Sequence, residues 1–243
     1  MMGAIGWASL GTLFTFMMTA LGAGTVFILT GEGQSRWQRR MLGFAAGVMT
    51  AAAVWSLLLP AIQRAEALGL PGWGPASVGT AAGAAFLAAM ELLLEKRQGD
   101  HGGALLMTAI TLHNIPEGMA VGLAFALASE GDALAGAAAL ALGVGLQNFP
   151  EGAAVALPLA GRGKGRAFLM GLLSGAVEPL CGITVVLFAG LATPMMPWLL
   201  SFSAGAMLYV VAQELVPQAH GRGGTCGYLV GFIVMMVMDV ALG

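Results

Sequence analysis

Eight apolar stretches follow one another along this chain, separated by short polar breaks, and they constrain the fold more than any other feature. A membrane-spanning helix needs about 20 predominantly apolar residues, and each stretch is close to that length or longer. Only 9% of the residues are charged, whereas a soluble domain carries about a quarter. A chain of this composition cannot cover itself with a wetted surface, so we predict an all-α polytopic membrane protein.

The spans take up almost the whole sequence and leave no room for a sizeable soluble domain. We therefore expect a single transmembrane domain over residues 1–243. The first apolar run has no positively charged segment before it and is too long for a signal peptide, so it is kept as a span. The expected spans are 5–29, 42–63, 75–95, 104–128, 134–160, 166–191, 195–219 and 225–242.

Positive charges are distributed unevenly over the connections between spans. Of the 10 Lys and Arg residues, Arg64 alone lies in an even-numbered connection. Since Lys and Arg accumulate on the cytoplasmic side of a membrane, we expect the odd connections in the cytoplasm and both termini outside. The net charge is −2 and no basic patch is present, so a nucleic-acid partner is not expected.

Three acids stand near the middle of consecutive spans: Glu117, Glu151 and Glu178. An ionised side chain at mid-bilayer costs about 3 kcal/mol on insertion scales, and no Lys or Arg lies well inside a span to pair with one. Either a cation visits these acids or they are protonated. Glu91 and Asp239 lie nearer the ends of their spans, where an acid costs less, so the sequence favours no function for them.

The first two of these acids belong to a duplicated motif. Span four reads LHNIPEGMAV (112–121) and span five reads LQNFPEGAAV (146–155), which share the pattern N-x-P-E-G-x-A-V. Consecutive spans run antiparallel, so one motif occurs twice in opposite directions. A pseudo-two-fold axis in the membrane plane produces such a pattern.

The spacing within each copy places polar groups on one helix face. His113 and Glu117 are four residues apart, as are Gln147 and Glu151. Each proline of the motif lacks an N–H and frees a carbonyl four residues earlier, and each glycine leaves room for a facing helix. Imidazole, amide and carboxylate groups suit Zn²⁺ or another first-row metal. The expected metal ligands are His113, Asn114, Glu117, Gln147, Asn148, Glu151 and Glu178.

Span seven ends in QELVPQAH, where Glu214 and His220 flank Pro217. The two side chains form either a cytoplasmic exit relay for an ion or an ordinary interfacial helix end. Both interpretations stay open on the sequence.

HNIPEG, QNFPEG, the glutamate of span six and ELVPQAH resemble the ZIP (Zrt/Irt-like) family of divalent metal transporters, in particular its bacterial branch. The resemblance covers essentially the whole chain. It implies uptake of Zn²⁺, often with Cd²⁺, Fe²⁺, Mn²⁺ or Co²⁺, into the cytoplasm, and a 3+2+3 arrangement in which spans four and five lie between two inverted three-helix repeats. It also implies that Glu117 and Glu151 bridge two metal ions, one served by His113 and Gln147 and the other by Asn114, Asn148 and Glu178.

Two further expectations follow from the resemblance. The protein would lie in a cell membrane, the bacterial cytoplasmic (inner) membrane, with the transported ion and lipid as its partners and a homodimer left open. It would need no catalytic cofactor.

The chain departs from the family pattern at three places. Many relatives carry His at the position of Gln147 and some carry Asp at the position of Asn148, so the site here has less negative charge and lower basicity than in those relatives. The His-rich loop common in the family is reduced to QGDHGG, which gives no support to metal sensing by that loop.

An intramembrane metal-dependent hydrolase is the competing class, because His, Glu and a metal together can activate water. The chain has no H-E-x-x-H motif, no evident nucleophile and only one His near the midplane. A receptor or scaffold that transports nothing is a third class, and the acids near the midplane argue against it, because such a protein would not need them. A site on inverted repeats suits alternating access, so we expect a divalent metal transporter and not an enzyme.

Overall fold

The computed structural model describes residues 3–29, 33–98, 102–128, 132–189 and 193–242. Within these ranges the side chains of residues 33–35, 94–98, 102–113, 132, 158, 189, 193 and 242 are not described. The described residues form helices joined by short turns, without a strand. The helices are α1 (Ala4–Gly24), α2 (Gly33–Ala52), α3 (Leu59–Ala67), α4 (Trp73–Gln98), α5 (Gly102–Leu127), α6 (Asp132–Leu159), α7 (Lys164–Gly175), α8 (Val177–Ala189), α9 (Met196–Val210), α10 (Val216–Gln218) and α11 (Arg222–Leu242).

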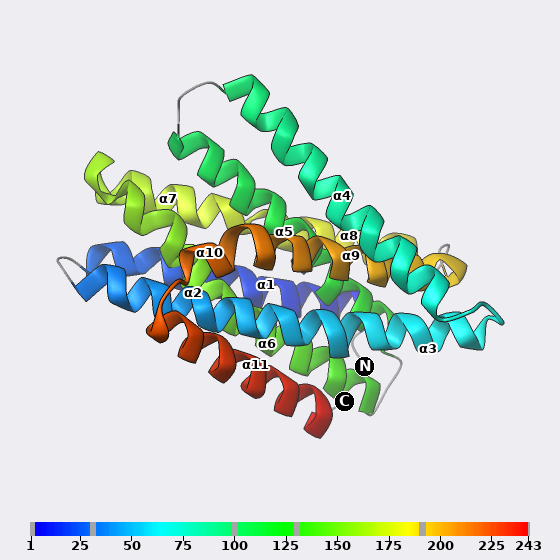
Figure 1. The fold of residues 1–243 in the computed structure, drawn as a ribbon. Coiled ribbons are helices and arrows are strands. Elements are labelled where there is room, and N and C mark those ends of the chain that lie inside the picture. Colours follow the sequence, from blue (N-terminus) through cyan, green and yellow to red (C-terminus); the bar gives the residue numbers. More distant parts are fainter. Residues whose placement is uncertain (1–2, 30–32, 99–101, 129–131, 190–192, 243) are drawn as a thin grey trace.

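Several consecutive helices join into single passes across the molecule, so that the described helices make eight passes (Figure 1). The α2 and α3 helices are joined through η2 (Ala53–Leu58), and α9 and α10 through η5 (Val211–Leu215). Seven of the described passes are long and apolar enough to cross a membrane, and the eighth, α5, contributes the shorter apolar segment Asn114–Leu127. The predicted polytopic helical membrane fold is therefore confirmed.

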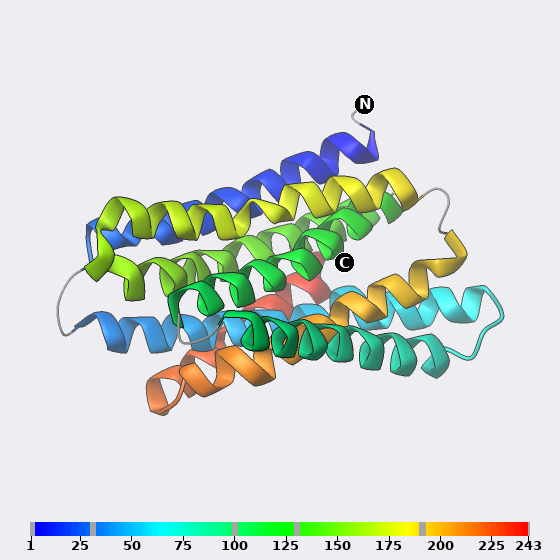
Figure 2. The same ribbon diagram turned by 90° about the horizontal axis from the view of Figure 1, so that it is seen from above.

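The two chain termini lie at the same end of the bundle (Figures 1 and 2). Helices α3, α5 and α8 end on this side too, and α1, α4, α6 and α10 end on the opposite side (Figure 1). Successive passes thus end alternately at the two ends of the bundle, as an antiparallel succession of passes requires.

Two helix pairs are built by the same close backbone packing. A Cβ on Gly231 of α11 would lie 2.1 Å from the carbonyl oxygen of Phe44 on α2, and one on Gly83 of α4 would lie 2.0 Å from the carbonyl oxygen of Phe202 on α9. Only glycine permits such an approach, which is the usual way for helices to pack tightly in lipid. Helices α5 and α6 lie between these pairs, with α5 against α8 and α6 against α1.

Prolines account for the irregular points of the passes. Pro60 and Pro217 each follow a π-helical segment, η2 and η5, because a proline ring pushes against the carbonyl four residues earlier and removes one hydrogen bond. Pro179 has the same effect in the sixth pass, where α7 ends at Gly175 and α8 begins at Val177. In α5, by contrast, the helix continues through Pro116.

Candidate metal site

The described side chains of the predicted ligand set are buried together in the middle of the bundle. None of the six is more than 6% exposed, and Glu117, Gln147, Asn148 and Glu178 are fully buried. His113 lies on α5 one turn before Glu117, and its side chain is outside the described residues. The other members of the set are Asn114 and Glu151.

Four oxygen atoms of this cluster are buried without a hydrogen-bond partner: Glu117 Oε2, Gln147 Oε1, Asn148 Oδ1 and Glu151 Oε1. Buried polar atoms are nearly always paired, and leaving one unpaired costs about 1–3 kcal/mol. All four atoms are acceptors from the two copies of the duplicated motif. A bound cation would provide these unpaired acceptor oxygens with a favourable partner.

Two amide groups of α6 donate hydrogen bonds to two of the three glutamates. The Nε2 of Gln147 donates to Glu117 Oε1 at 2.6 Å, and the Nδ2 of Asn148 donates to Glu178 Oε2 at 2.8 Å. Each amide nitrogen thus points at a carboxylate of a neighbouring helix and leaves its own oxygen free. Unpaired amide oxygens and unpaired carboxylate oxygens are thus buried in the same cluster.

The two asparagines of the motif make equivalent contacts on opposite sides of the site. Asn114 Nδ2 donates to the carbonyl oxygen of Ser174 on α7 at 2.7 Å. Asn148 Nδ2 also approaches the carbonyl oxygen of Thr15 on α1, at 3.3 Å. Each asparagine therefore fixes its motif helix to the helix that packs beside it.

The two glycines of the motif allow their helices to pack closely, as the sequence predicted. A Cβ on Gly118 would lie 2.4 Å from the carbonyl oxygen of Glu178, and a Cβ on Gly152 would lie 2.0 Å from the carbonyl oxygen of Thr19. These distances are too short for any other residue. The glycine after each motif glutamate thus brings a third helix against the site, α8 in one copy and α1 in the other.

Two threonines of α1 belong to the site and were missed by the sequence analysis. Thr15 and Thr19 are buried, and the hydroxyl of Thr19 donates to Glu178 Oε1 at 3.2 Å. The hydroxyl of Thr15 faces the same carboxylate. A buried threonine in an apolar span has no distinctive sequence signal, because its hydroxyl ordinarily bonds to its own helix.

The site is strongly acidic for its surroundings. Glu117 lies within electrostatic range of both Glu151 and Glu178. Among the described residues, no group of three His, Cys, Asp or Glu side chains is assembled tightly enough to hold a metal by itself.

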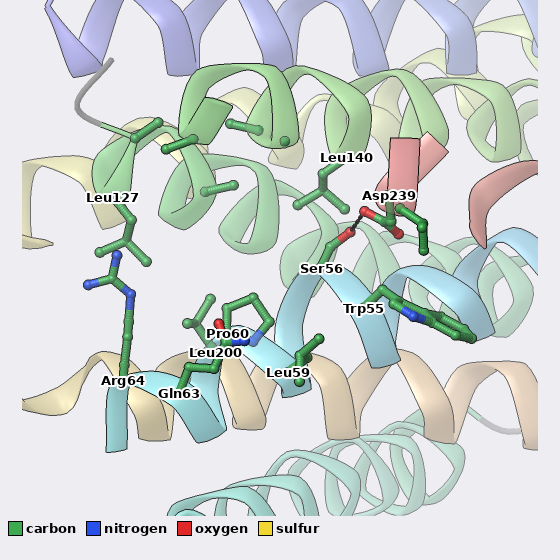
Figure 3. A pocket seen from close by; sticks show the side chains of 16 residues that line it. Trp55, Ser56, Leu59, Pro60, Gln63, Arg64, Leu127, Leu140, Leu200 and Asp239 are labelled. Carbon is green, nitrogen blue, oxygen red and sulfur yellow. Dashed lines mark hydrogen bonds between the residues drawn. The ribbon is translucent and has the colours of Figure 1, made fainter. Parts of the chain in front are cut away.

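A cavity of about 470 Å³ opens between η2, α3, α5, α6, α9 and α11 (Figure 3), toward the end of the bundle that holds both termini (Figure 1). Ser56 donates a hydrogen bond to Asp239 on its wall, and Arg64 lies on the far side of the cavity (Figure 3). The second carboxylate oxygen of Asp239, Oδ2, is buried without a partner. Leu140 of α6 lines the cavity, and Gln147 follows it by about 10 Å along the helix.

The structure gives Asp239 surroundings that the sequence did not predict. The sequence suggested an acid tolerated at a helix end. Instead its carboxylate faces a cavity that is lined mostly by apolar residues and reaches Leu140 on α6. Position along the chain indicated its depth in the membrane, but not the cavity formed where α11 packs on the irregular segment η2.

At the opposite end, the predicted exit relay is not joined by direct contacts. Glu214 accepts a hydrogen bond from Gln218 Nε2 at 3.2 Å. His220 is exposed, and its Nδ1 lies 3.3 Å from the carbonyl oxygen of Pro217. No hydrogen bond links these two described side chains. Glu214 lies instead within electrostatic range of Glu91, which accepts a hydrogen bond from the hydroxyl of Tyr209.

The sequence also matches a family model described as ZIP zinc transporter, over residues 94–239. The match covers more than half of the chain and includes both motif copies. The chain belongs to the ZIP zinc transporter family. Membership places it among transporters and not among enzymes, which removes the hydrolase alternative.

Individual members of the ZIP family are similar to this chain over nearly its whole length. The human zinc transporter ZIP11 is 37% identical, over 97% of this chain and 97% of its own. The zinc transporter GufA of Myxococcus xanthus is 36% identical over 93% of this chain and 95% of its own. The zinc transporter ZIPB of Bordetella bronchiseptica is 37% identical over 98% of this chain and 82% of its own.

Proposed function

We propose that this protein carries Zn²⁺ through the membrane into the cytoplasm, by way of the buried cluster on α5, α6 and α8. The observation that supports it most is the group of four unpaired oxygens from Glu117, Gln147, Asn148 and Glu151. A dry, apolar bundle that leaves so many acceptors unpaired is suited to a cation that arrives, replaces its hydration shell with these oxygens and leaves again. The zinc transporters among its relatives support the choice of ion.

The ligand assignment is part of the proposal. His113, Glu117, Gln147 and Glu151 form a first site, and Asn114, Asn148 and Glu178 complete a second site that shares the two motif glutamates. The mixture of imidazole, amide and carboxylate ligands suits borderline ions, so Cd²⁺, Fe²⁺, Mn²⁺ and Co²⁺ are the competing substrates to compare with Zn²⁺. The protein needs no further cofactor for this function.

The route to and from the cluster is supported by acids at both ends of the bundle. The cavity that contains Asp239 serves as the entrance, because its unpaired oxygen can attract a cation before it reaches the cluster. Glu214 and His220 act on the exit side, with Glu91 beside Glu214. His220 would take part only through water or a rearrangement, since no direct bond joins it to Glu214.

We also propose the 3+2+3 arrangement with inverted repeats, in one transmembrane domain whose termini face outward. The equivalent asparagine contacts to the carbonyls of Thr15 and Ser174 support it. So do the matching glycine contacts of Gly83 and Gly231. The bacterial cytoplasmic membrane is the proposed location, with a homodimer as the assembly to consider.

Reconstituted vesicles test the function directly. Purified protein in sealed vesicles with a zinc-sensitive dye inside should produce a saturable rise of internal zinc when Zn²⁺ is added outside, whereas vesicles without protein should not. Adding Cd²⁺, Fe²⁺, Mn²⁺ or Co²⁺ in competition then ranks the substrates. Zinc that binds to the protein without accumulating inside would contradict the proposal.

Labelling in intact cells tests the orientation. Ala67 and Gly161 are exposed at opposite ends of the bundle, and a side chain at residue 161 meets nothing within 4 Å. With Cys181 and Cys226 replaced by serine, Ala67→Cys should react with an impermeant maleimide from outside. Gly161→Cys should react only after permeabilisation, and the reverse pattern would overturn the proposed orientation.

A further inference from the structure

Three threonines lie on one face of α1 and point into the bundle. Thr12, Thr15 and Thr19 are at most 1% exposed, and their spacing places them on the same side of the helix. Threonine in a membrane helix ordinarily bonds to a carbonyl of the preceding turn, as Thr12 does with Ala8 at 2.8 Å. Thr19 differs, because its hydroxyl also donates to the Glu178 carboxylate of α8, which the Thr15 hydroxyl faces as well.

The hydroxyl of Thr19 has one proton and two acceptors within reach. The carbonyl oxygen of Thr15 lies at 3.3 Å and Glu178 Oε1 at 3.2 Å. A charged acceptor forms a bond roughly twice as strong as a neutral one. The proton is therefore donated to Glu178 when that carboxylate is ionised, which is the form that binds metal.

Glu178 differs from the other two glutamates in how its oxygens are held. Thr19 donates to Oε1 and Asn148 donates to Oε2, whereas Glu117 and Glu151 each keep an oxygen without a partner. A carboxylate oxygen that accepts one hydrogen bond retains a second lone pair. Glu178 is thus fixed in orientation by donors from α1 and α6 and is still able to bind an ion.

The internal correspondence of the fold assigns Thr19 a particular place. Thr15 and Ser174 occupy equivalent positions, since the backbone carbonyl of each accepts a hydrogen bond from an asparagine of the motif. Thr19 follows Thr15 by four residues, as Glu178 follows Ser174. Gly118 and Gly152 of the motif pack against the backbone of Glu178 and Thr19, respectively. Thr19 therefore occupies on α1 the position that Glu178 occupies on α8, with a neutral donor in place of an acid.

We propose that Thr19 is a positioning residue of the metal site. Its hydroxyl holds the Glu178 carboxylate in the orientation in which Glu178, together with Asn148, binds the second ion. This inference rests on the two-ion site proposed above. Residues that orient a ligand without touching the metal typically change metal affinity by about 10–100-fold when they are removed. The effect is confined to the second ion, because the first ion does not use Glu178.

Calorimetric titration of the purified protein with Zn²⁺ provides the test. Thr19→Val removes the hydroxyl at nearly constant shape and should weaken the second ion about 10–100-fold while the first ion binds as before. Thr19→Ser keeps the hydroxyl and should bind both ions as the parent does. Thr12→Val is the matched control, because the hydroxyl of Thr12 bonds only to its own helix, and it should change neither ion.

The outcomes separate this inference from the proposed function. If Thr19→Val bound both ions as tightly as the parent, or lost both equally, Thr19 would have no positioning role. The same conclusion would follow if Thr12→Val gave the same loss, or if the parent bound only one ion. A parent that bound no Zn²⁺ at all would remove the proposed function itself.

Discussion

Zinc uptake by vesicles that contain Glu117→Gln or Glu151→Gln is expected to fall by at least about a hundredfold. Removing a residue that only hydrogen-bonds to a metal ligand already lowers metal affinity about 10–100-fold, and removing a ligand itself should cost more. Glu117 is fully buried, and its Oε2 has no hydrogen-bond partner. Glutamine keeps the shape but replaces a charged oxygen by an amide group. Glu151 Oε1 is likewise without a partner, so both variants lose a direct ligand.

The design separates loss of a ligand from loss of the fold. Glu66→Gln removes an exposed acid at the end of α3 and is expected to transport at the parent rate. All three variants should insert and elute as the parent does, since glutamine is nearly isosteric with glutamate. Normal uptake by Glu117→Gln would exclude that residue from the ion site and leave its burial unexplained.

The duplicated motif made much of the site predictable. Two copies of N-x-P-E-G at the same depth in antiparallel spans required that Glu117 and Glu151 meet, and the structure buries both among amide groups. The motif glycines were equally predictable, because a small residue beside a buried acid indicates a close helix crossing. Periodicity and apolar length determined the passes, since in lipid only helices satisfy every backbone group of such a chain.

The residues that complete the site could not be predicted, because they depend on contacts between distant segments. Thr19 and Glu178 are 159 positions apart, and nothing in the apolar run around Thr19 distinguishes it from threonines that bond to their own helix. Asp239 was set aside for a related reason. It lines a cavity beside η2, and a proline in the sequence does not reveal whether the helix relaxes into a π-helical segment before it.

Replacing Asn148 by aspartate is expected to lower the stability of the metal-free protein and to tighten the second ion. Asn148 Nδ2 donates to Glu178 Oε2 at 2.8 Å and to the Thr15 carbonyl at 3.3 Å. Aspartate has no N–H, so it would leave both acceptors facing another oxygen. A buried acceptor left unsatisfied costs about 1–3 kcal/mol, and the added charge faces a second carboxylate. Thermal unfolding in detergent with a chelator present should show the loss.

The same change acts in the opposite direction once metal is bound. Glu117, Glu151 and Glu178 carry a formal −3, and two Zn²⁺ ions bring +4, so the loaded site keeps one positive charge that aspartate would neutralise. Two unit charges 4 Å apart interact by about 4 kcal/mol at an effective dielectric constant near 20, and two divalent ions repel each other about four times as strongly. Repulsion is therefore a dominant cost of loading the second ion, and one more carboxylate offsets part of it.

Titration with Zn²⁺ and thermal unfolding at saturating Zn²⁺ measure this effect, with Asn148→Ala as the matched control. Alanine removes the amide without adding charge, so it should weaken the second ion, whereas aspartate should tighten it by at least about tenfold, or 1.4 kcal/mol. The unfolding temperature of Asn148→Asp should thus lie below that of the parent without metal and gain more than the parent does on metal addition. Equal affinity for two ions in the parent, or no change in Asn148→Asp, would show that residue 148 acts only as a spacer between α6 and its neighbours.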